Sequence, residues 1–276
     1  MTTKLLGIPY DAHSSFLRGP ADAPAAVRAA LHCGSANWTT ELGETVDPSD
    51  AAWTDLGDLV LGEEVEPALA ASADGVTAAI GDGSSLLSLG GDHLVTWPIV
   101  RAMSERYDDL TILHFDAHPD LYDELDGDRF SHACPFARIM EEGRAARLVQ
   151  LGIRTMTDHQ RDQADRFGVE VHEYRSWDGL VPQLQGPVYI SVDVDVLDPA
   201  FAPGISHFEP GGMSTRQLID SLHQLRPGGE ANRGNQLTLV GADVVEINPR
   251  RDVNDMTAMV GAKLARELIG LLSRSR

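Results

Sequence analysis

Acidic and imidazole side chains follow several apolar runs of the sequence at alternate positions. The run "LTIL" leads into "HFDAHPD", which places Asp116, His118 and Asp120 two residues apart, and "VYISVDVDV" does the same with Asp193 and Asp195. Alternate residues of an extended chain share one face. Buried charges must be paired or bind a metal ion. Either segment alone is typical of a capped turn, but the two together indicate a metal site.

A divalent cation would remove the repulsion among these carboxylates, which otherwise raise one another's pKa. A third run, "SLLSLGGDH", adds the imidazole of His93. Oxygen and imidazole ligands without a thiolate suit Mn²⁺ better than tetrahedral Zn²⁺. Six ligands are many for one ion and carboxylates can bridge, so we predict two Mn²⁺ ions per chain. The predicted ligands are His93, Asp116, His118, Asp120, Asp193 and Asp195.

These residues stand at the ends of predicted strands that alternate with predicted helices. We expect strands at 4–9, 85–90, 110–115, 147–153, 188–194 and 238–247, a weaker one at 169–174, and helices at 24–31, 65–80, 214–225 and from about 254. The alternation favours an α/β fold with a parallel sheet covered by helices. In such sheets, sites form at the carboxyl ends of strands.

Charge and composition exclude several other classes of protein. The formal net charge of −20 argues against a nucleic-acid partner, which requires a basic surface. We find no apolar run long enough to span a membrane and no signal peptide, so we expect no membrane partner. Cys33 and Cys134 are too few for a disulfide framework, which predicts a cytoplasmic protein with free thiols.

The motifs together resemble the ureohydrolases, the family of arginase, agmatinase, formimidoylglutamase and guanidino-acid hydrolases. The resemblance is carried by "GGDH" (90–93), "DAHPD" (116–120), "SHACPF" (131–136), "SVDVDVLDPAFAPG" (191–204), "EINP" (246–249) and the opening "GIPYDAHSSFLRGPADAPAAVR". It spans nearly the whole chain. It implies an arginase-like fold, a three-layer α/β/α single domain (1–276) with a mainly parallel sheet of about eight strands, assembled as a homotrimer or homohexamer.

The resemblance also implies a role for each site residue. One Mn²⁺ would be held by His93, Asp116, Asp120 and Asp193, and the other by Asp116, His118, Asp193 and Asp195. Glu246 matches the carboxylate that holds the substrate's guanidinium, and His132 matches the histidine of the substrate-side loop. A hydroxide bridging the metals would attack the guanidinium carbon to give urea and a primary amine. Asp120 would pass a proton to the leaving amine, and His132 would shuttle protons.

The substrate is less well determined by the sequence. The loop "LYDELDGDRFSH" (121–132) is acidic, and acidic residues at the pocket mouth would attract a cationic tail, which predicts an agmatine-like substrate. The alternative is that this loop is an ordinary solvated surface. The chain has "GISHFEP" (204–210) where agmatinases and arginases usually have "GTGTPE", which makes His207 a candidate substrate-binding residue. The alternative is a guanidino or formimino acid (guanidinobutyrate, arginine or formiminoglutamate) whose carboxylate meets Arg129 or His207.

Two further alternatives belong to other classes. A non-catalytic metal-binding relative would be expected to lack ligands or Glu246, but all these positions are filled. A single-Zn²⁺ hydrolase related to histone deacetylases would use fewer carboxylates. Within the "HFD" segment, we expect His114 to face away from Asp116 as an ordinary core histidine.

Overall fold

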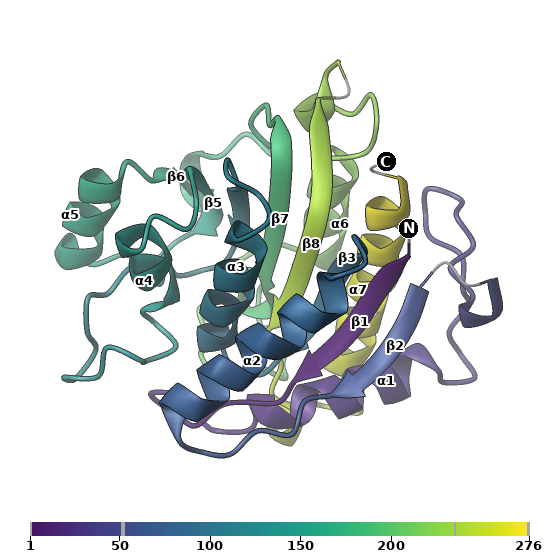
Figure 1. The fold of residues 1–276 in the computed structure, drawn as a ribbon, viewed down its shortest axis with the longest axis horizontal. Helices are drawn as coiled ribbons and strands as arrows, with labels where there is room; N and C mark the ends of the chain where they lie inside the picture. Colours follow the sequence, from purple (N-terminus) through teal and green to yellow (C-terminus); the bar gives the residue numbers. More distant parts are fainter. Residues whose placement is uncertain (1, 51–52, 235, 275–276) are drawn as a thin grey trace.

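The computed structural model describes residues 2–50, 53–234 and 236–274, which form one eight-stranded sheet (Figure 1). The strand order is β2-β1-β3-β8-β7-β4-β5-β6, and each pair of neighbouring strands in this sheet is parallel. The strands are β1 (Thr3–Ile8), β2 (Trp53–Asp58), β3 (Ser85–Gly90), β4 (Thr111–Phe115), β5 (Arg147–Ile153), β6 (Glu170–Glu173), β7 (Gly186–Asp193) and β8 (Leu237–Val245).

Helices cover both faces of this sheet, which confirms the predicted three-layer α/β/α arrangement. The helices are α1 (Ala23–Leu31), α2 (Val65–Ile80), α3 (Thr96–Ser104), α4 (Pro135–Glu141), α5 (Asp158–Phe167), α6 (Thr215–His223) and α7 (Met256–Arg274). One face carries α2 to α5, and the other carries α1, α6 and α7 (Figure 1). None of the helices in the described part of the chain is both long and apolar enough to cross a membrane.

The sheet separates two hydrophobic cores because successive side chains of a strand point to opposite faces. Leu86 and Ile112 pack into the core beneath α2 and α3. Their neighbours Leu87 and Leu113 pack into the core beneath α1, α6 and α7. Strands that are buried on both faces need apolar residues at almost every position, which explains the continuous apolar runs of the sequence.

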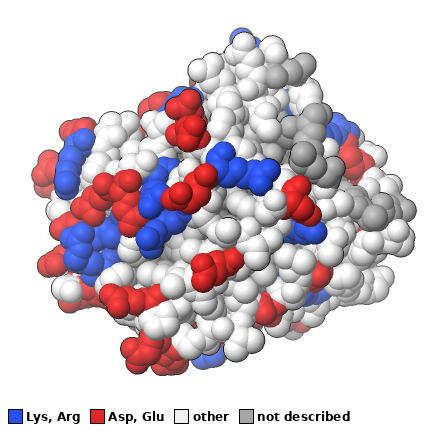
Figure 2. All heavy atoms as spheres, in the orientation of Figure 1, with Lys and Arg blue, Asp and Glu red and all other residues white. Residues whose placement is uncertain are grey.

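Charged side chains of both signs are mixed on the outer surface, despite the large net negative charge. Figure 2 shows lysine and arginine side chains among the acidic ones on the face that carries α2 to α5. Arg144, for example, pairs with Glu105 at 2.5 Å, and Arg101 pairs with Glu142 at 3.3 Å. Exposed pairs of this kind contribute little to stability.

The seven predicted strands and four predicted helices all form, with ends shifted by about two residues at most. The eighth strand, β2, was not predicted because its sequence "WTDLGD" is polar and lies at the sheet edge, where only Trp53 is buried. Helices α3, α4 and α5 were also not predicted. The four central strands β3, β8, β7 and β4 are the ones whose carboxyl ends carry the predicted metal ligands and Glu246.

Candidate active site

The site lies where the central strands end side by side. His93 begins a short 3-10 turn after β3, Asp116 follows β4, Asp193 closes β7 and Glu246 follows β8. The loops interlock through backbone hydrogen bonds, from Glu246 N to the Gly91 carbonyl at 2.9 Å and from Asp92 N to the Tyr10 carbonyl at 2.9 Å.

Only glycine fits at position 91, because a Cβ there would lie 1.8 Å from the Tyr10 carbonyl oxygen. The close approach of two backbones in this loop therefore explains the second glycine of "GGDH".

Two of the predicted site residues have left-handed backbone conformations that are unfavourable for residues other than glycine. The φ angle is 48° at Asp120 and 64° at Glu246. Such conformations cost about 1–3 kcal/mol each and persist where the surrounding structure enforces them, most often at functional sites. Here they turn both carboxylates inward, and both side chains are buried at the strand ends.

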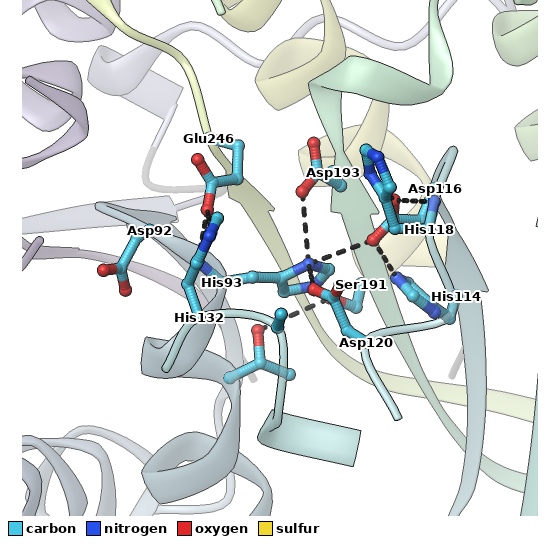
Figure 3. A network of polar contacts seen from close by, with 12 residues as sticks. Asp92, His93, His114, Asp116, His118, Asp120, His132, Ser191, Asp193 and Glu246 are labelled. Atoms are coloured by element: carbon cyan, nitrogen blue, oxygen red, sulfur yellow. Dashed lines mark hydrogen bonds and ion pairs between the residues drawn. The ribbon is translucent and has the colours of Figure 1, made fainter. Parts of the chain in front are cut away.

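Four predicted ligands converge on one point beneath the pocket. His93 Nδ1 lies 3.1 Å from Asp116 Oδ2, 3.0 Å from Asp120 Oδ2 and 3.2 Å from Asp193 Oδ2 (Figure 3). All four residues are buried, and their ligand atoms lie within 4.8 Å of one another. Ligand atoms around one octahedrally coordinated ion are separated by about 3 Å, so this spacing fits a metal ion.

The hydrogen bonds of His93 leave its Nδ1 atom free to bind such an ion. Ser191 Oγ donates to Asp243 Oδ1 at 2.7 Å, so it accepts from His93 Nε2 at 3.0 Å. Within the described residues, His93 Nδ1 is buried without a hydrogen-bond partner of its own. Burial would lower the pKa of His93, but Asp116, Asp120 and Asp193 raise it well above its usual value. This point of the structure therefore requires a positive charge.

A second cluster adjoins the first and shares Asp116 with it. His118 Nδ1 lies 3.0 Å from Asp195 Oδ2 and 3.5 Å from Asp116 Oδ1. Burial and the charges of Asp195 and Asp116 raise the pKa of Asp193 well above its usual value. Burial, followed by the charge of Asp116, likewise raises the pKa of Asp195 to about 6. The structure thus brings all six predicted ligands together, and their binding of metal stays a prediction.

A third cluster joins Glu246, His132 and His207 beside the predicted ligands. Glu246 Oε1 accepts from the backbone N–H of His93 at 3.0 Å and lies 2.8 Å from His132 Nδ1 (Figure 3). Glu246 Oε2 is buried and has no hydrogen-bond partner among the described residues. One carboxylate oxygen is therefore anchored, and the other can accept a hydrogen bond from a ligand.

The charges of this third cluster follow from its geometry. Burial would lower the pKa of His132, but the charge of Glu246 and its hydrogen bond raise that pKa to about 9. Burial would raise the pKa of Glu246, but His132 lowers it below its usual value. At neutral pH, His132 is therefore protonated and Glu246 is ionised.

Ser15 is a site residue that the sequence analysis did not single out. Its Oγ lies 2.9 Å from His132 Nε2 and 3.4 Å from His207 Nε2. Its only sequence signal was its place in the opening segment "GIPYDAHSSFLRGP".

The candidate substrate pocket has a cavity of about 180 Å³. Its lining includes the predicted site residues His118, Asp120, His132, Asp193, Asp195, His207 and Glu246, together with Ser15, Tyr122, Leu125, Ala133, Thr155, Thr157 and Gln160. The predicted positions of His207 and His132 beside the pocket agree with this structure.

The loop acids do not form the acidic pocket mouth that we expected. None of Asp123, Glu124, Asp126 and Asp128 lines the pocket. Asp123 is paired with Arg138 at 2.7 Å and with Arg129 at 2.5 Å, and Asp128 is paired with His13 at 2.5 Å. Arg129 does not line the pocket either, so it is not placed to meet a substrate carboxylate there.

The expectation that His114 faces away from Asp116 is wrong. His114 Nε2 lies 2.8 Å from Asp116 Oδ2 (Figure 3). Residues two apart in a strand share a face, so the alternation that groups the aspartates also places His114 with them.

The fold and the site define a class of protein: a parallel α/β protein with a buried centre of carboxylates and imidazoles suited to metal ions, beside a small pocket. Residues 2–270 match the model of the Arginase family, and the chain belongs to that family. It is a ureohydrolase, an enzyme that hydrolyses C–N bonds of linear amidines.

Individual relatives are similar over almost the whole chain. Arginase 1, mitochondrial, of Arabidopsis thaliana is 46% identical over 99% of this chain and 82% of that protein. Agmatinase of Bacillus anthracis is 32% identical over 96% of this chain and 90% of its own length. The solved structure of the arginase from Medicago truncatula superposes with a TM-score of 0.87 and 42% identity, over 98% of this chain and 87% of that one.

Proposed function

We propose that the protein hydrolyses the guanidino group of a small linear substrate to urea and a primary amine, with two Mn²⁺ ions per chain. The observation that supports this most directly is that His118, Asp120, Asp193 and Asp195 line the same pocket as Glu246. Predicted metal ligands and a carboxylate for the guanidinium thus lie side by side.

The predicted ligands would hold the two ions in the two clusters described above, which share Asp116. When bound, the pair of cations would neutralise the clustered carboxylates and provide hydroxide at neutral pH. The oxygen-rich set, with imidazole and no thiolate among its members, favours Mn²⁺ over Zn²⁺.

Glu246 would bind and orient the guanidinium. Its Oε2 atom is buried and unpaired among the described residues, and its negative charge is fixed by His132. A planar cation that donates N–H groups to this carboxylate is held by charge-assisted hydrogen bonds. Orientation matters because guanidinium is a poor electrophile that must be aligned with its nucleophile.

His132 would shuttle protons to the leaving amine or to bulk water. It is protonated at neutral pH, and its Nε2 atom contacts Ser15 Oγ in the pocket wall. Asp120 lies in both the pocket wall and the first cluster, which supports it as the residue that takes a proton from the nucleophile and passes it to the leaving amine. The two residues would together balance the proton transfers of the hydrolysis.

We propose L-arginine as the first substrate to test. Relatives with 46% identity over nearly the whole chain are named arginases. In addition, the amino end of α5 reaches the pocket through Thr157 and Gln160, and the positive end of a helix dipole favours a carboxylate.

Agmatine, the substrate that the sequence analysis favoured, is the second candidate. No lysine or arginine lines the pocket in the part of the chain that the structure describes, which favours a substrate without a carboxylate. Relatives named agmatinase are more distant, at 32% identity.

The test is a panel of four substrates with Mn²⁺-loaded protein: arginine, agmatine, 4-guanidinobutyrate and formiminoglutamate. We expect urea from arginine or agmatine, with kcat/KM at least about tenfold above that of the other compounds. Formamide from formiminoglutamate as the main product would assign a different substrate class. Failure of the Mn²⁺-loaded protein to release urea or formamide from any of them would refute the proposal.

We further propose, from the family resemblance alone, that the chain assembles as a homotrimer or homohexamer. Light scattering coupled to size-exclusion chromatography would measure the mass of the assembly. A mass equal to the 29.8 kDa of one chain would contradict this.

A further inference from the structure

We propose that His114 and Gln150 are positioning residues of the metal centre, which hold the Asp116 carboxylate through a hydrogen-bond relay of fixed direction. The inference rests on the proposed metal-dependent function and deepens it, because Asp116 belongs to both ligand clusters. Neither His114 nor Gln150 lines the pocket, so both would act through Asp116 and not on the substrate.

The relay runs across two neighbouring strands. His114 on β4 is paired in register with Gln150 on β5, and both side chains are completely buried. Gln150 Nε2 lies 2.7 Å from the Pro119 carbonyl oxygen and 3.0 Å from His114 Nδ1. At the other edge of the ring, His114 Nε2 lies 2.8 Å from Asp116 Oδ2, and Figure 3 shows the ring aimed at that carboxylate.

The direction of these hydrogen bonds follows from the Pro119 carbonyl. A carbonyl oxygen only accepts, so the Gln150 atom that faces it is the amide nitrogen. A flipped amide would place two acceptors against each other. The second hydrogen of the same nitrogen points to His114 Nδ1, which must therefore accept.

An imidazole that accepts at Nδ1 carries its proton at Nε2. His114 thus donates to Asp116 Oδ2 and cannot present a lone pair to it.

The consequence is a carboxylate that is anchored at both oxygens. Asp116 Oδ1 accepts from the backbone N–H of His118 at 2.5 Å, while Oδ2 accepts from His114. The His114 ring is itself fixed by packing on Phe136, with ring centroids 4.0 Å apart. Groups that orient a metal ligand in this way typically change metal affinity 10- to 100-fold when they are removed.

The competing explanation is that His114 and Gln150 only satisfy each other's buried hydrogen-bonding groups in the core. The two explanations differ in what a substitution changes. A core role predicts a lower unfolding temperature in chelator, with unchanged Mn²⁺ affinity of the protein that remains folded. A positioning role predicts weaker Mn²⁺ binding even where that unfolding temperature is preserved.

Three variants separate the explanations. His114→Phe keeps a ring for packing but removes the donor, and His114→Gln retains an N–H donor near the position of Nε2. Gln150→Glu keeps the shape of the side chain but replaces the donor by an acceptor, which would move the ring proton of His114 from Nε2 to Nδ1. We expect His114→Phe and Gln150→Glu to bind Mn²⁺ about 10- to 100-fold more weakly, and His114→Gln to recover most of the affinity.

The measurements are Mn²⁺ titration calorimetry of each full-length chain and its unfolding temperature in chelator. Wild-type affinity in both His114→Phe and Gln150→Glu would overturn the relay while leaving the proposed function intact. Absence of Mn²⁺ binding by the wild type would instead refute the proposed function, and this inference with it.

A measurement on the wild-type protein covers the case in which the variants do not fold. In ¹⁵N-histidine-labelled protein, the His114 signals should show an unprotonated Nδ1 and a protonated Nε2. A His114 ring protonated at Nδ1 and not at Nε2 would overturn the inference.

Discussion

Buried carboxylates occur in two parts of this molecule, and their surroundings differ. Glu267 on α7 is buried, and its carboxylate lies 2.5 Å from Lys263 Nζ and 3.0 Å from His223 Nε2. Burial would raise the pKa of Glu267, but its hydrogen bonds with His223 and Lys263 lower it to about 2. The chain itself supplies the positive charge that this carboxylate requires.

At the carboxyl ends of β4 and β7 the balance is reversed. Within the described residues, no lysine or arginine pairs with Asp116, Asp193 or Asp195; their neighbours are imidazoles and one another. Burial would raise the pKa of Asp116, but the contacting histidines hold it well below its usual value. Burial and like charges raise the pKa of Asp193 well above its usual value. A buried acid that is paired with a lysine or arginine of the chain, here called a matched acid, is a structural feature. A group of buried acids without such a partner, here called unmatched acids, indicates a site for an external cation.

The largest effect should follow from neutralising one of the unmatched acids. We expect Asp193→Asn to lower kcat/KM about a thousandfold or more, since the metal ions contribute several kcal/mol to transition-state stabilisation. The rise in unfolding temperature on adding Mn²⁺ should disappear. In chelator, however, the variant should be at least as stable as the wild type, because a repulsive charge has been removed.

Urea release, metal content per chain and thermal unfolding with and without chelator test this prediction. Two Mn²⁺ per chain together with normal turnover in Asp193→Asn would show that the unmatched acids are not a metal centre.

The next largest effect is expected at Glu246, where one carboxylate oxygen is hydrogen-bonded to the protein and the other can accept a hydrogen bond from a ligand. We expect Glu246→Gln to lower kcat/KM about 10- to 100-fold, the loss of a charge-assisted hydrogen bond worth about 1.5–3 kcal/mol. Metal content should stay at the wild-type value, because Glu246 lies outside both ligand clusters. Steady-state kinetics on the preferred substrate would check this, and loss of metal from the variant would contradict the division between ligands and substrate carboxylate.

The matched acid should respond in stability and not in activity. We expect Glu267→Gln to lower the free energy of unfolding by about 1–3 kcal/mol at pH 7, since a buried hydrogen bond between charged groups is broken. The pKa of Glu267 is lowered from 4.5 to about 2, so its contribution is complete above about pH 4.5 and is lost as the pH falls toward 2.

Urea unfolding at several pH values, all in chelator, measures this contribution. The difference between wild type and Glu267→Gln should be constant from pH 7 to about pH 5 and should narrow below pH 4.5. Mn²⁺ affinity should be unchanged. A difference that stays constant or grows as the pH falls below 4.5 would mean that the pKa of Glu267 is not lowered in the folded protein.

The sequence predicted the unmatched acids better than the matched one, for a physical reason. Alternate spacing places Asp116, His118 and Asp120 together as soon as a strand is recognised. Lys263 lies four residues before Glu267 on α7, which is a local pattern. The other partners, His223 on α6 and the backbone N–H of Glu41, come from segments that no local pattern brings together.

The same distinction explains why α5 was missed. Strands buried on both faces are visible as apolar runs, whereas α5 has an almost entirely polar sequence, "DHQRDQADRF". Its start is marked instead by a capping box between Thr157 and Gln160, a signal that does not depend on hydrophobic periodicity. The acidic loop was misjudged because the contacts of its acids with Arg138 and His13 cannot be seen in sequence.

An exposed acid provides the smallest effect and the control for the others. Glu170 on β6 pairs with Arg147 on β5 at 2.7 Å, and this hydrogen bond lowers the pKa of Glu170, as the partners of Glu267 lower the pKa of that residue. The Glu170 side chain is 44% exposed, however, so hydration of the separated charges compensates for most of the stabilising energy of the ion pair. We expect Glu170→Gln to change the free energy of unfolding by about 0.2–1 kcal/mol, and by less still at high salt. Urea unfolding at low and high ionic strength, alongside Glu267→Gln, would measure it. An effect of Glu170→Gln as large as that of Glu267→Gln would mean that the ion pair itself, and not the burial of its carboxylate, determines how much a matched acid stabilises this fold.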